Sequence, residues 1–163
     1  MKSAFYLVAL ALCMSISIPL FSQDSSAVED FEALQISGTI SHINENMAEV
    51  TVSLYEGNKV VDSFETKKNG KFKFTLYNHE IYTIELKKKG YYTKRISINT
   101  DLPEGYEDFE KFQFDIGMTL KDEAEYNKEL KDYPSAVIAF DEKKQVFAFD
   151  KDYTETYFDE IER

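Results

Sequence analysis

The sequence has a single cysteine, no tryptophan and only two histidines, and these shortages exclude several kinds of chemistry. The cysteine, Cys13, lies in an apolar N-terminal stretch, so the rest of the chain can form no disulfide and offers no catalytic thiol. His42 and His79 fall in separate expected turns, which favours exposed turn residues over a metal site or a triad. Walker, Rossmann, His-Glu-x-x-His and Gly-x-Ser-x-Gly motifs are absent too. We therefore expect no enzyme and no cofactor or metal.

Charge is scarce at the N-terminus, where Lys2 is the only charged residue before Asp24. An apolar run from Ala4 to Leu20 follows and then gives way to polar residues. This pattern predicts a signal peptide over residues 1–22, cut after Ser22 or, as second choice, after Ala27. A single transmembrane anchor is the alternative, but the run is short for a span and Pro19 interrupts it. We expect an exported chain that is periplasmic, displayed on the outer surface or secreted.

Basic residues are few in the second half of the chain. Residues 101–163 carry 19 acidic against 8 basic residues, whereas residues 23–100 carry 11 against 10. Such an acidic chain is a poor candidate for binding nucleic acid. The polar stretch 23–33 is expected to be a flexible leader. The acidic part after residue 120 is too rich in Phe, Tyr and Ile to be simply disordered.

Apolar and polar residues alternate from residue 34 onward, which is typical of strands with one buried face. Seven strands are predicted near residues 34–41, 50–54, 60–66, 71–76, 82–86, 91–98 and 112–120. Asn69-Gly70 is expected to join the third and fourth in a two-residue hairpin, with positive φ at both residues. The side chains expected in the core include Phe72, Phe74, Phe112, Phe114 and Ile116. The fold class is mainly β, a seven-stranded antiparallel sandwich over residues 34–120.

The remaining segment, residues 121–163, changes character. Residues 121–131 are predicted to form a short helix or loop that stops before Pro134, and residues 136–140 and 146–149 a β-hairpin. Asp150 is a plausible N-cap for a helix from Lys151 to about Ile161. We expect these pieces to form a small acidic α+β appendage docked on the sandwich.

Five short sequence motifs follow one another along the expected sandwich region. They are Gly38, Ala48-Glu-Val50, Asn69-Gly70-Lys-Phe72-Lys-Phe74, Tyr82-Thr-Ile84 and Gly90-Tyr91. This series resembles the carboxypeptidase regulatory-like domain, a transthyretin-like and Ig-like sandwich. The resemblance implies an accessory, binding or spacer role in the bacterial cell envelope, without chemistry of its own.

Basic residues cluster around two expected turns that lie at the same end of an up-and-down sheet. We call this cluster the basic pole; its residues are Lys67, Lys68, Lys71, Lys73, Lys87, Lys88, Lys89, Tyr91, Tyr92, Lys94 and Arg95. The pole could bind an anionic partner. Alternatively, Asp122, Glu123 and Glu125 of the same chain could neutralise it.

These features favour an exported, non-enzymatic accessory or protein-interaction module of the cell envelope. Its partner would be another envelope protein. The alternative is a carbohydrate or anionic-ligand binding module that uses the basic pole, with an acidic glycan or an anionic lipid headgroup as ligand. Composition leaves the oligomeric state open.

Overall fold

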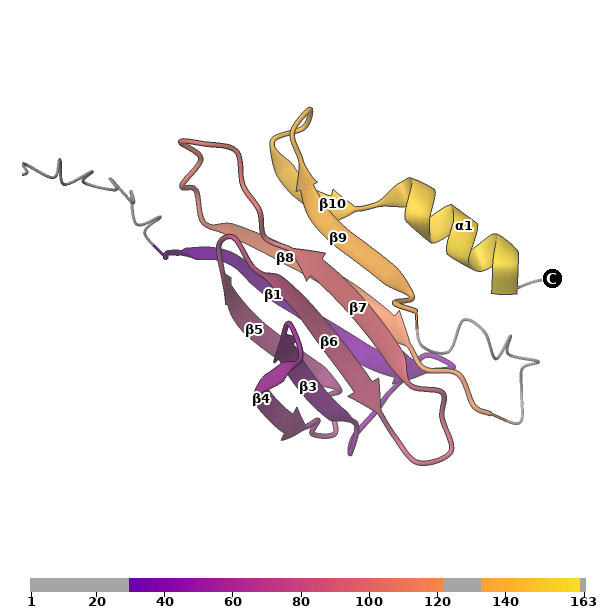
Figure 1. Ribbon diagram of the computed structural model, residues 1–163. Coiled ribbons are helices and arrows are strands. Elements are labelled where there is room, and N and C mark those ends of the chain that lie inside the picture. The colour runs from indigo at the N-terminus through magenta and orange to yellow at the C-terminus, as the bar shows by residue number, and fades with distance from the viewer. Residues whose placement is uncertain (1–29, 122–132, 162–163) are drawn as a thin grey trace, which may run out of the picture.

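The computed structural model describes residues 30–121 and 133–161, which form two facing β-sheets with one helix beside them (Figure 1). The signal peptide and most of the leader lie outside these residues. Sheet A contains β1 (Glu32–His42), β2 (Glu45–Asn46), β5 (Lys71–Tyr77) and β8 (Glu110–Gly117). Sheet B contains β10 (Val146–Phe149), β9 (Ala136–Asp141), β7 (Lys94–Asn99), β6 (Ile81–Lys87), β3 (Thr51–Glu56) and β4 (Lys59–Glu65), in that spatial order. The helix is α1 (Lys151–Ile161).

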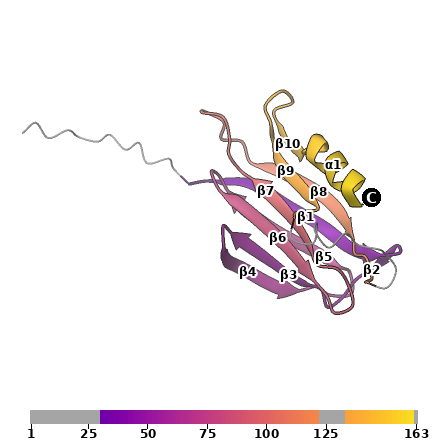
Figure 2. The same ribbon diagram turned by 45° about the vertical axis from the view of Figure 1, so that its right-hand side comes forward.

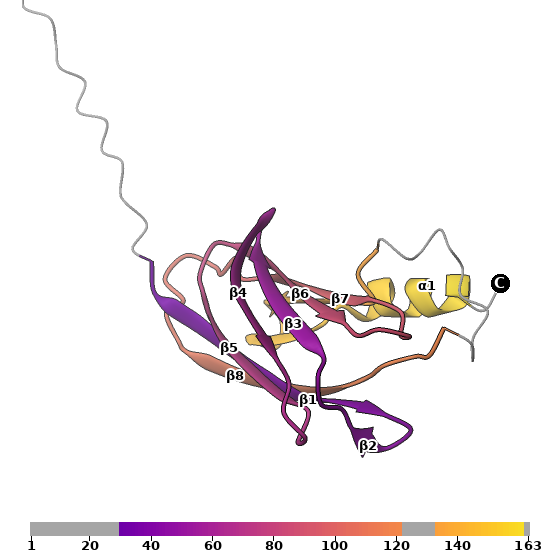
Figure 3. The ribbon, with the colours of Figure 1, turned by 90° about the horizontal axis from the view of Figure 1, so that it is seen from below.

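The core lies between the two sheets, seen nearly edge-on in Figure 3. Most strands contribute the apolar half of their alternating pattern, because successive side chains of a strand point to opposite faces, whereas β2 and β4 are almost wholly exposed. The fully buried residues include Leu34, Ile36 and Ile40 on β1, and Ile84 and Leu86 on β6. The sequence prediction of strands with one buried face is thus confirmed for most of the sandwich. Among the described residues, no helix is long and apolar enough to cross a membrane.

The strand count and the strand directions differ from the expectation. Eight strands precede residue 120 in the described part of the chain rather than the seven expected, the additional one being β2, and with the hairpin the described residues form ten. Two of the pairings are parallel. β8 returns alongside β1 in the same direction, with Ile36 opposite Phe112 and Gly38 opposite Phe114. β9 runs parallel to β7, with Ile98 opposite Ile138. The sandwich therefore contains both antiparallel and parallel pairs, and in each parallel pair the two strands start from the same end.

The prediction of a hairpin at Asn69-Gly70 is wrong. β4 pairs with β3 in sheet B, whereas β5 pairs with β1 in sheet A, so this turn carries the chain from one sheet to the other. Of its two residues only Gly70 has positive φ, at 63°. The Gly70 carbonyl instead accepts a hydrogen bond from the Ile40 amide at 2.9 Å, which ties the turn to β1. The residue pair with positive φ at both positions is Ile43-Asn44, between β1 and β2.

The C-terminal hairpin continues sheet B rather than standing beside it. β9 adds to β7, and the hairpin places Ile138 (0% exposed) and Phe147 (3%) in the same core as the other strands. The division of the chain at residue 120 thus remains a prediction about folding units. The expected segment 121–131 lies almost entirely outside the described residues.

Helix α1 runs alongside β9 from the point where β10 ends (Figures 1 and 2). The predicted N-cap is confirmed, because the Asp150 carboxylate accepts a hydrogen bond from the Tyr153 amide at 3.0 Å. The Tyr153 hydroxyl donates to the Pro134 carbonyl at 2.6 Å, and Tyr157 is buried. The helix is therefore held by its tyrosines.

Two of the five predicted core residues lie near the surface. Phe72, Phe74 and Ile116 are buried as expected, but Phe112 and Phe114 are only half-buried. They belong to β8, an edge strand of sheet A, and Phe149 of β10 packs edge-on against both rings at 5.3 and 5.5 Å. An edge strand has a neighbouring strand on one side only, so the rings of Phe112 and Phe114 stay partly exposed.

Candidate functional site

The two lysine-rich turns lie at the same end of the sandwich. Gly70 is hydrogen-bonded to Ile40, and the Ile40 carbonyl in turn accepts from the amide of Met47 at 2.9 Å. From the other turn, the Lys88 ammonium donates to the carbonyl of Ala48 at 2.7 Å. The start of β5 and the end of β6 therefore lie at the same end of the sandwich, as the basic pole requires.

Lys87 and Arg95 are occupied by a carboxylate on the outer face of sheet B. The buried side chain of Glu85 lies 2.6 Å from the Lys87 ammonium and accepts from Arg95 Nε at 2.8 Å. The Tyr55 hydroxyl also donates to Glu85, at 3.1 Å. Burial tends to raise the pKa of Glu85, but the bonds from Lys87, Arg95 and Tyr55 outweigh it, so the pKa is lowered. Both cations are thus built into the fold.

Glu85 was missed by sequence reasoning, although a signal was present. Residues two apart on a strand share a face, so Glu85 and Lys87 had to be neighbours. The three acids expected to neutralise the pole, Asp122, Glu123 and Glu125, lie outside the described residues.

Four further residues of the pole are partly covered. Lys88 is 3.8 Å from the Glu49 carboxylate besides its bond to Ala48. The Tyr91 ring packs edge-on against His42 at 5.3 Å, and the Tyr92 amide donates to the Thr119 carbonyl at 3.0 Å. Lys94 is half-buried on the inward-facing side of β7, in line with Ile96 and Ile98, and burial lowers its pKa.

The other five lysines of the pole, Lys67, Lys68, Lys71, Lys73 and Lys89, are exposed, and none forms an ion pair with another described residue. Four of them follow one another along the turn before β5 and along β5 itself. Lys71 and Lys73 alternate with the buried Phe72 and Phe74, so their side chains stand on the outer face of sheet A. Apart from Lys89, the exposed lysines of the basic pole form a row along the start of β5 and the turn before it, which we call the lysine edge: Lys67, Lys68, Lys71 and Lys73.

β5 is also an edge strand, with β1 as its one neighbour among the described strands. In an antiparallel pair, the N–H and C=O of one residue point toward the partner and those of the next point away. The Gly70 carbonyl points to β1, and so do the groups of Phe72, Phe74 and Leu76. The backbone groups of Lys73 and Thr75 consequently point away from sheet A.

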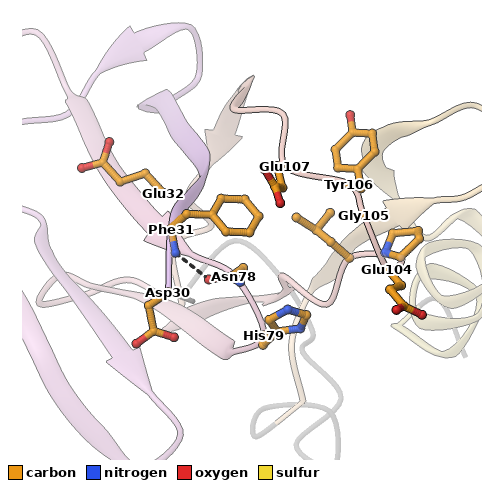
Figure 4. Close-up of a pocket in the computed structure, with 11 residues that line it drawn as sticks. Asp30, Phe31, Glu32, Asn78, His79, Glu104, Gly105, Tyr106 and Glu107 are labelled. Atoms are coloured by element: carbon orange, nitrogen blue, oxygen red, sulfur yellow. Dashed lines mark hydrogen bonds between the residues drawn. The ribbon is translucent and has the colours of Figure 1, made fainter. Parts of the chain in front are cut away.

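A pocket of about 740 Å³ lies at the opposite end of the sandwich, where the chain enters β1 (Figure 4). Phe31 and Asn78 line the pocket and are joined by two hydrogen bonds. The Phe31 amide donates to Asn78 Oδ1 at 2.9 Å, and the Asn78 amide donates to the Phe31 carbonyl at 3.1 Å. The carboxylates around it are Asp30, Glu32, Glu104 and Glu107. The pocket therefore carries negative charge, opposite in sign to the lysine edge.

Tyr106 lines the pocket and is fixed by a carboxylate. Its hydroxyl donates to Glu110 Oε1 at 2.7 Å, and that bond raises the pKa of Tyr106 to about 12. Glu110 also accepts from the Phe147 amide at 3.0 Å, which links the pocket loop to β10. His79 lies 3.8 Å from Asp101. Within residues 30–121 and 133–161 no three His, Cys, Asp or Glu side chains are grouped to hold a metal ion.

No protein-family model and no curated protein sequence matches this chain. Among solved structures, catechol 1,2-dioxygenase from Acinetobacter sp. ADP1 aligns at 12% identity over 60% of this chain and 55% of its own, with a TM-score of 0.39. A DUF3823 family protein from Parabacteroides merdae aligns at 14% identity over 55% and 46%, with a TM-score of 0.38. 3-Chlorocatechol 1,2-dioxygenase from Rhodococcus opacus 1CP aligns at 10% identity over 58% and 62%, with a TM-score of 0.34. The chain thus spans less than two thirds of each, and none of the three says what it binds or does.

Proposed function

We propose that this chain is an exported, non-enzymatic protein-interaction module of the cell envelope. The observation that carries the proposal is the lysine edge, a row of exposed cations along β5 and the turn before it, where the second side of β5 has no neighbour among the described strands. An open strand edge is a ready template for another chain, and natural sandwiches usually blunt or cover it. Here the lysines discourage pairing with another edge, but no described strand covers the middle of β5.

The sequence markers that resemble the carboxypeptidase regulatory-like domain agree with an accessory role, and we retain that family as part of the proposal. Export rests on the charge-poor apolar start of the sequence. A periplasmic or surface location follows from both.

Binding of a glycan or an anionic lipid headgroup by the lysine edge is the second candidate function. It is favoured by the exposure of all four lysines, since exposed cations attract any polyanion. It differs from the first candidate in needing only the charges and not the backbone of β5.

Site-specific photo-crosslinking in cells that produce the chain separates the two. A photoreactive residue at Thr75 should yield a protein adduct of one defined mass, whereas the same residue at Gln113, exposed on β8, should not. Solubilised envelopes passed over the immobilised chain provide the second readout. Retention of glycan or lipid without any protein adduct would overturn the first proposal in favour of the second.

A further inference from the structure

Within the described part of the chain, the outward backbone groups of β5 are open to strand addition. At one end the Lys71 amide is engaged by Asn69 Oδ1 at 3.3 Å, and at the other the Tyr77 amide donates to the Tyr82 hydroxyl at 3.3 Å. Between them the amides and carbonyls of Lys73 and Thr75 bond no other described residue. An incoming extended segment could therefore pair with the middle of β5 without displacing an existing bond.

The side chains along β5 define what the segment must carry. On the outer face it would lie beside Lys71 and Lys73, which carry two positive charges about two residues apart. On the inner face it would meet Phe64 of β4, which is half-buried and packs against Phe74 at 5.6 Å. Acidic residues on one face and apolar residues on the other satisfy both, and an extended chain presents such faces by simple alternation.

We propose that the free edge of β5 takes up an extended segment of a partner protein in which acidic and apolar residues alternate, as an added strand of sheet A. This inference rests on the proposed function and names the partner's chemistry. Lysines on an edge normally repel other edges and so prevent aggregation. An acidic segment reverses that effect, because each carboxylate placed beside Lys71 or Lys73 turns repulsion into attraction.

A second copy of this chain is a poorer occupant. Two β5 strands pairing edge to edge would bring two rows of lysines together, and like charges on neighbouring strands destabilise a sheet. Asp115, an exposed acid of β8, does not relieve this repulsion, because β1 lies between β8 and β5.

The test uses the full mature chain and a seven-residue peptide, capped at both ends, in which glutamate alternates with valine and threonine. NMR titration should show saturable binding. Peptide binding should also slow hydrogen exchange at the amides of Lys73 and Thr75. A peptide with lysine in place of each glutamate, and a peptide of the same composition without alternation, should bind at least about tenfold more weakly.

Matched variants distinguish the contribution of the β5 backbone to peptide binding from that of the lysine charges. Thr75→Pro removes an outward amide and should weaken binding at least about fivefold, since a hydrogen bond and the strand's fit are both lost. Ser63→Pro places the same change at an outward position of the other edge strand, β4, and should leave binding unchanged. Lys71→Gln with Lys73→Gln should weaken binding about fivefold or more, whereas Lys111→Gln on β8 should not.

Three results would overturn strand addition: no peptide binding at millimolar concentration, binding without protection of Lys73 and Thr75, or binding that Thr75→Pro leaves intact. Dextran sulfate that competes fully while Thr75→Pro has no effect would mean that only the charges are read. If the peptide test fails while an envelope protein is still crosslinked at another exposed position, the proposed function stands and only this inference is wrong. If no protein is crosslinked at any position, the proposed function itself is wrong.

Discussion

Gly38 occupies a place in the centre of sheet A where no side chain fits. A Cβ at this position would overlap the Phe114 carbonyl of β8 and would lie 2.8 Å from the Phe72 ring of β5. Gly38→Ala should therefore lower the free energy of unfolding by about 3 kcal/mol, at the upper end of overpacking effects, because the parallel pairing of β1 and β8 must yield. Urea denaturation measures it.

Ser37→Ala is the matched control, because Ser37 directly precedes Gly38 on the same strand and points to the opposite, outer face. It should change the stability by no more than about 0.5 kcal/mol. Equal effects at both positions would show that β8 does not lie against β1 as described.

Glu85 gives the fold a dependence on acid pH. Its pKa in the folded protein is lowered below the usual 4.5, because its bonds to Lys87, Arg95 and Tyr55 outweigh the effect of burial. Its stabilising contribution is hence complete above pH 4.5 and disappears as the pH falls through the lower, folded-state pKa. Glu85→Gln should cost about 1–3 kcal/mol at pH 7 and much less once the carboxylate of the unmodified chain is protonated.

Thermal unfolding of the two proteins between pH 7 and pH 2.5 measures this difference. Glu65→Gln, at an exposed carboxylate of β4, should have little effect at either end of that range. A constant penalty for Glu85→Gln across the range would mean that the Glu85 charge contributes nothing.

The hairpin between β1 and β2 carries backbone strain. Ile43 has φ of 45° and Asn44 of 63°, and a β-branched residue in this left-handed region costs roughly 1–2 kcal/mol. The Ile43 side chain is 73% exposed and offers no burial to offset the cost. Ile43→Asn should consequently raise the free energy of unfolding by about 1 kcal/mol. Ile43→Val keeps the branched Cβ and should bring no gain; chemical denaturation of both variants decides.

Sequence periodicity predicted most strands of this fold but not their partners. The alternation of apolar and polar residues indicates which residues of β4 and β5 face inward. It does not indicate whether these two strands pair with each other. The deciding contacts are distant: Gly38 admits both Phe72 and the β8 backbone, and Gly70 bonds to Ile40. β4 was also hard to read because nearly all of its residues are exposed.

The lysine cluster was predicted as one group, and the structure divides it. Its pairings depend on the register of three strands, which brings Tyr55, Glu85 and Arg95 together on one face. No local pattern encodes that register. The pocket beside Phe31 escaped notice for a similar reason, since residues from the leader, one turn and one loop meet there.

The C-terminal hairpin contributes to the core of the sandwich. A chain ending at Leu120 would lose the buried side chains of Ile138 and Phe147 and would leave β7 as a new edge. Its unfolding midpoint should accordingly fall well below that of the full chain, since removing a large buried side chain alone costs about 3–5 kcal/mol. Circular dichroism during urea titration measures it. An unchanged midpoint would support the division at residue 120.

The position of β1 has a consequence for the order of events when the chain folds. β1 is the central strand of sheet A, yet its parallel neighbour β8 comes late: the Thr39 amide bonds to Asp115, 76 positions further along the chain. During synthesis β1 must therefore wait, with one side unpaired, until residue 117 has emerged. Pairings of this range place folding on the millisecond-to-second scale typical of β-rich chains. Until then the unpaired edge of β1 is a target for other unfinished chains.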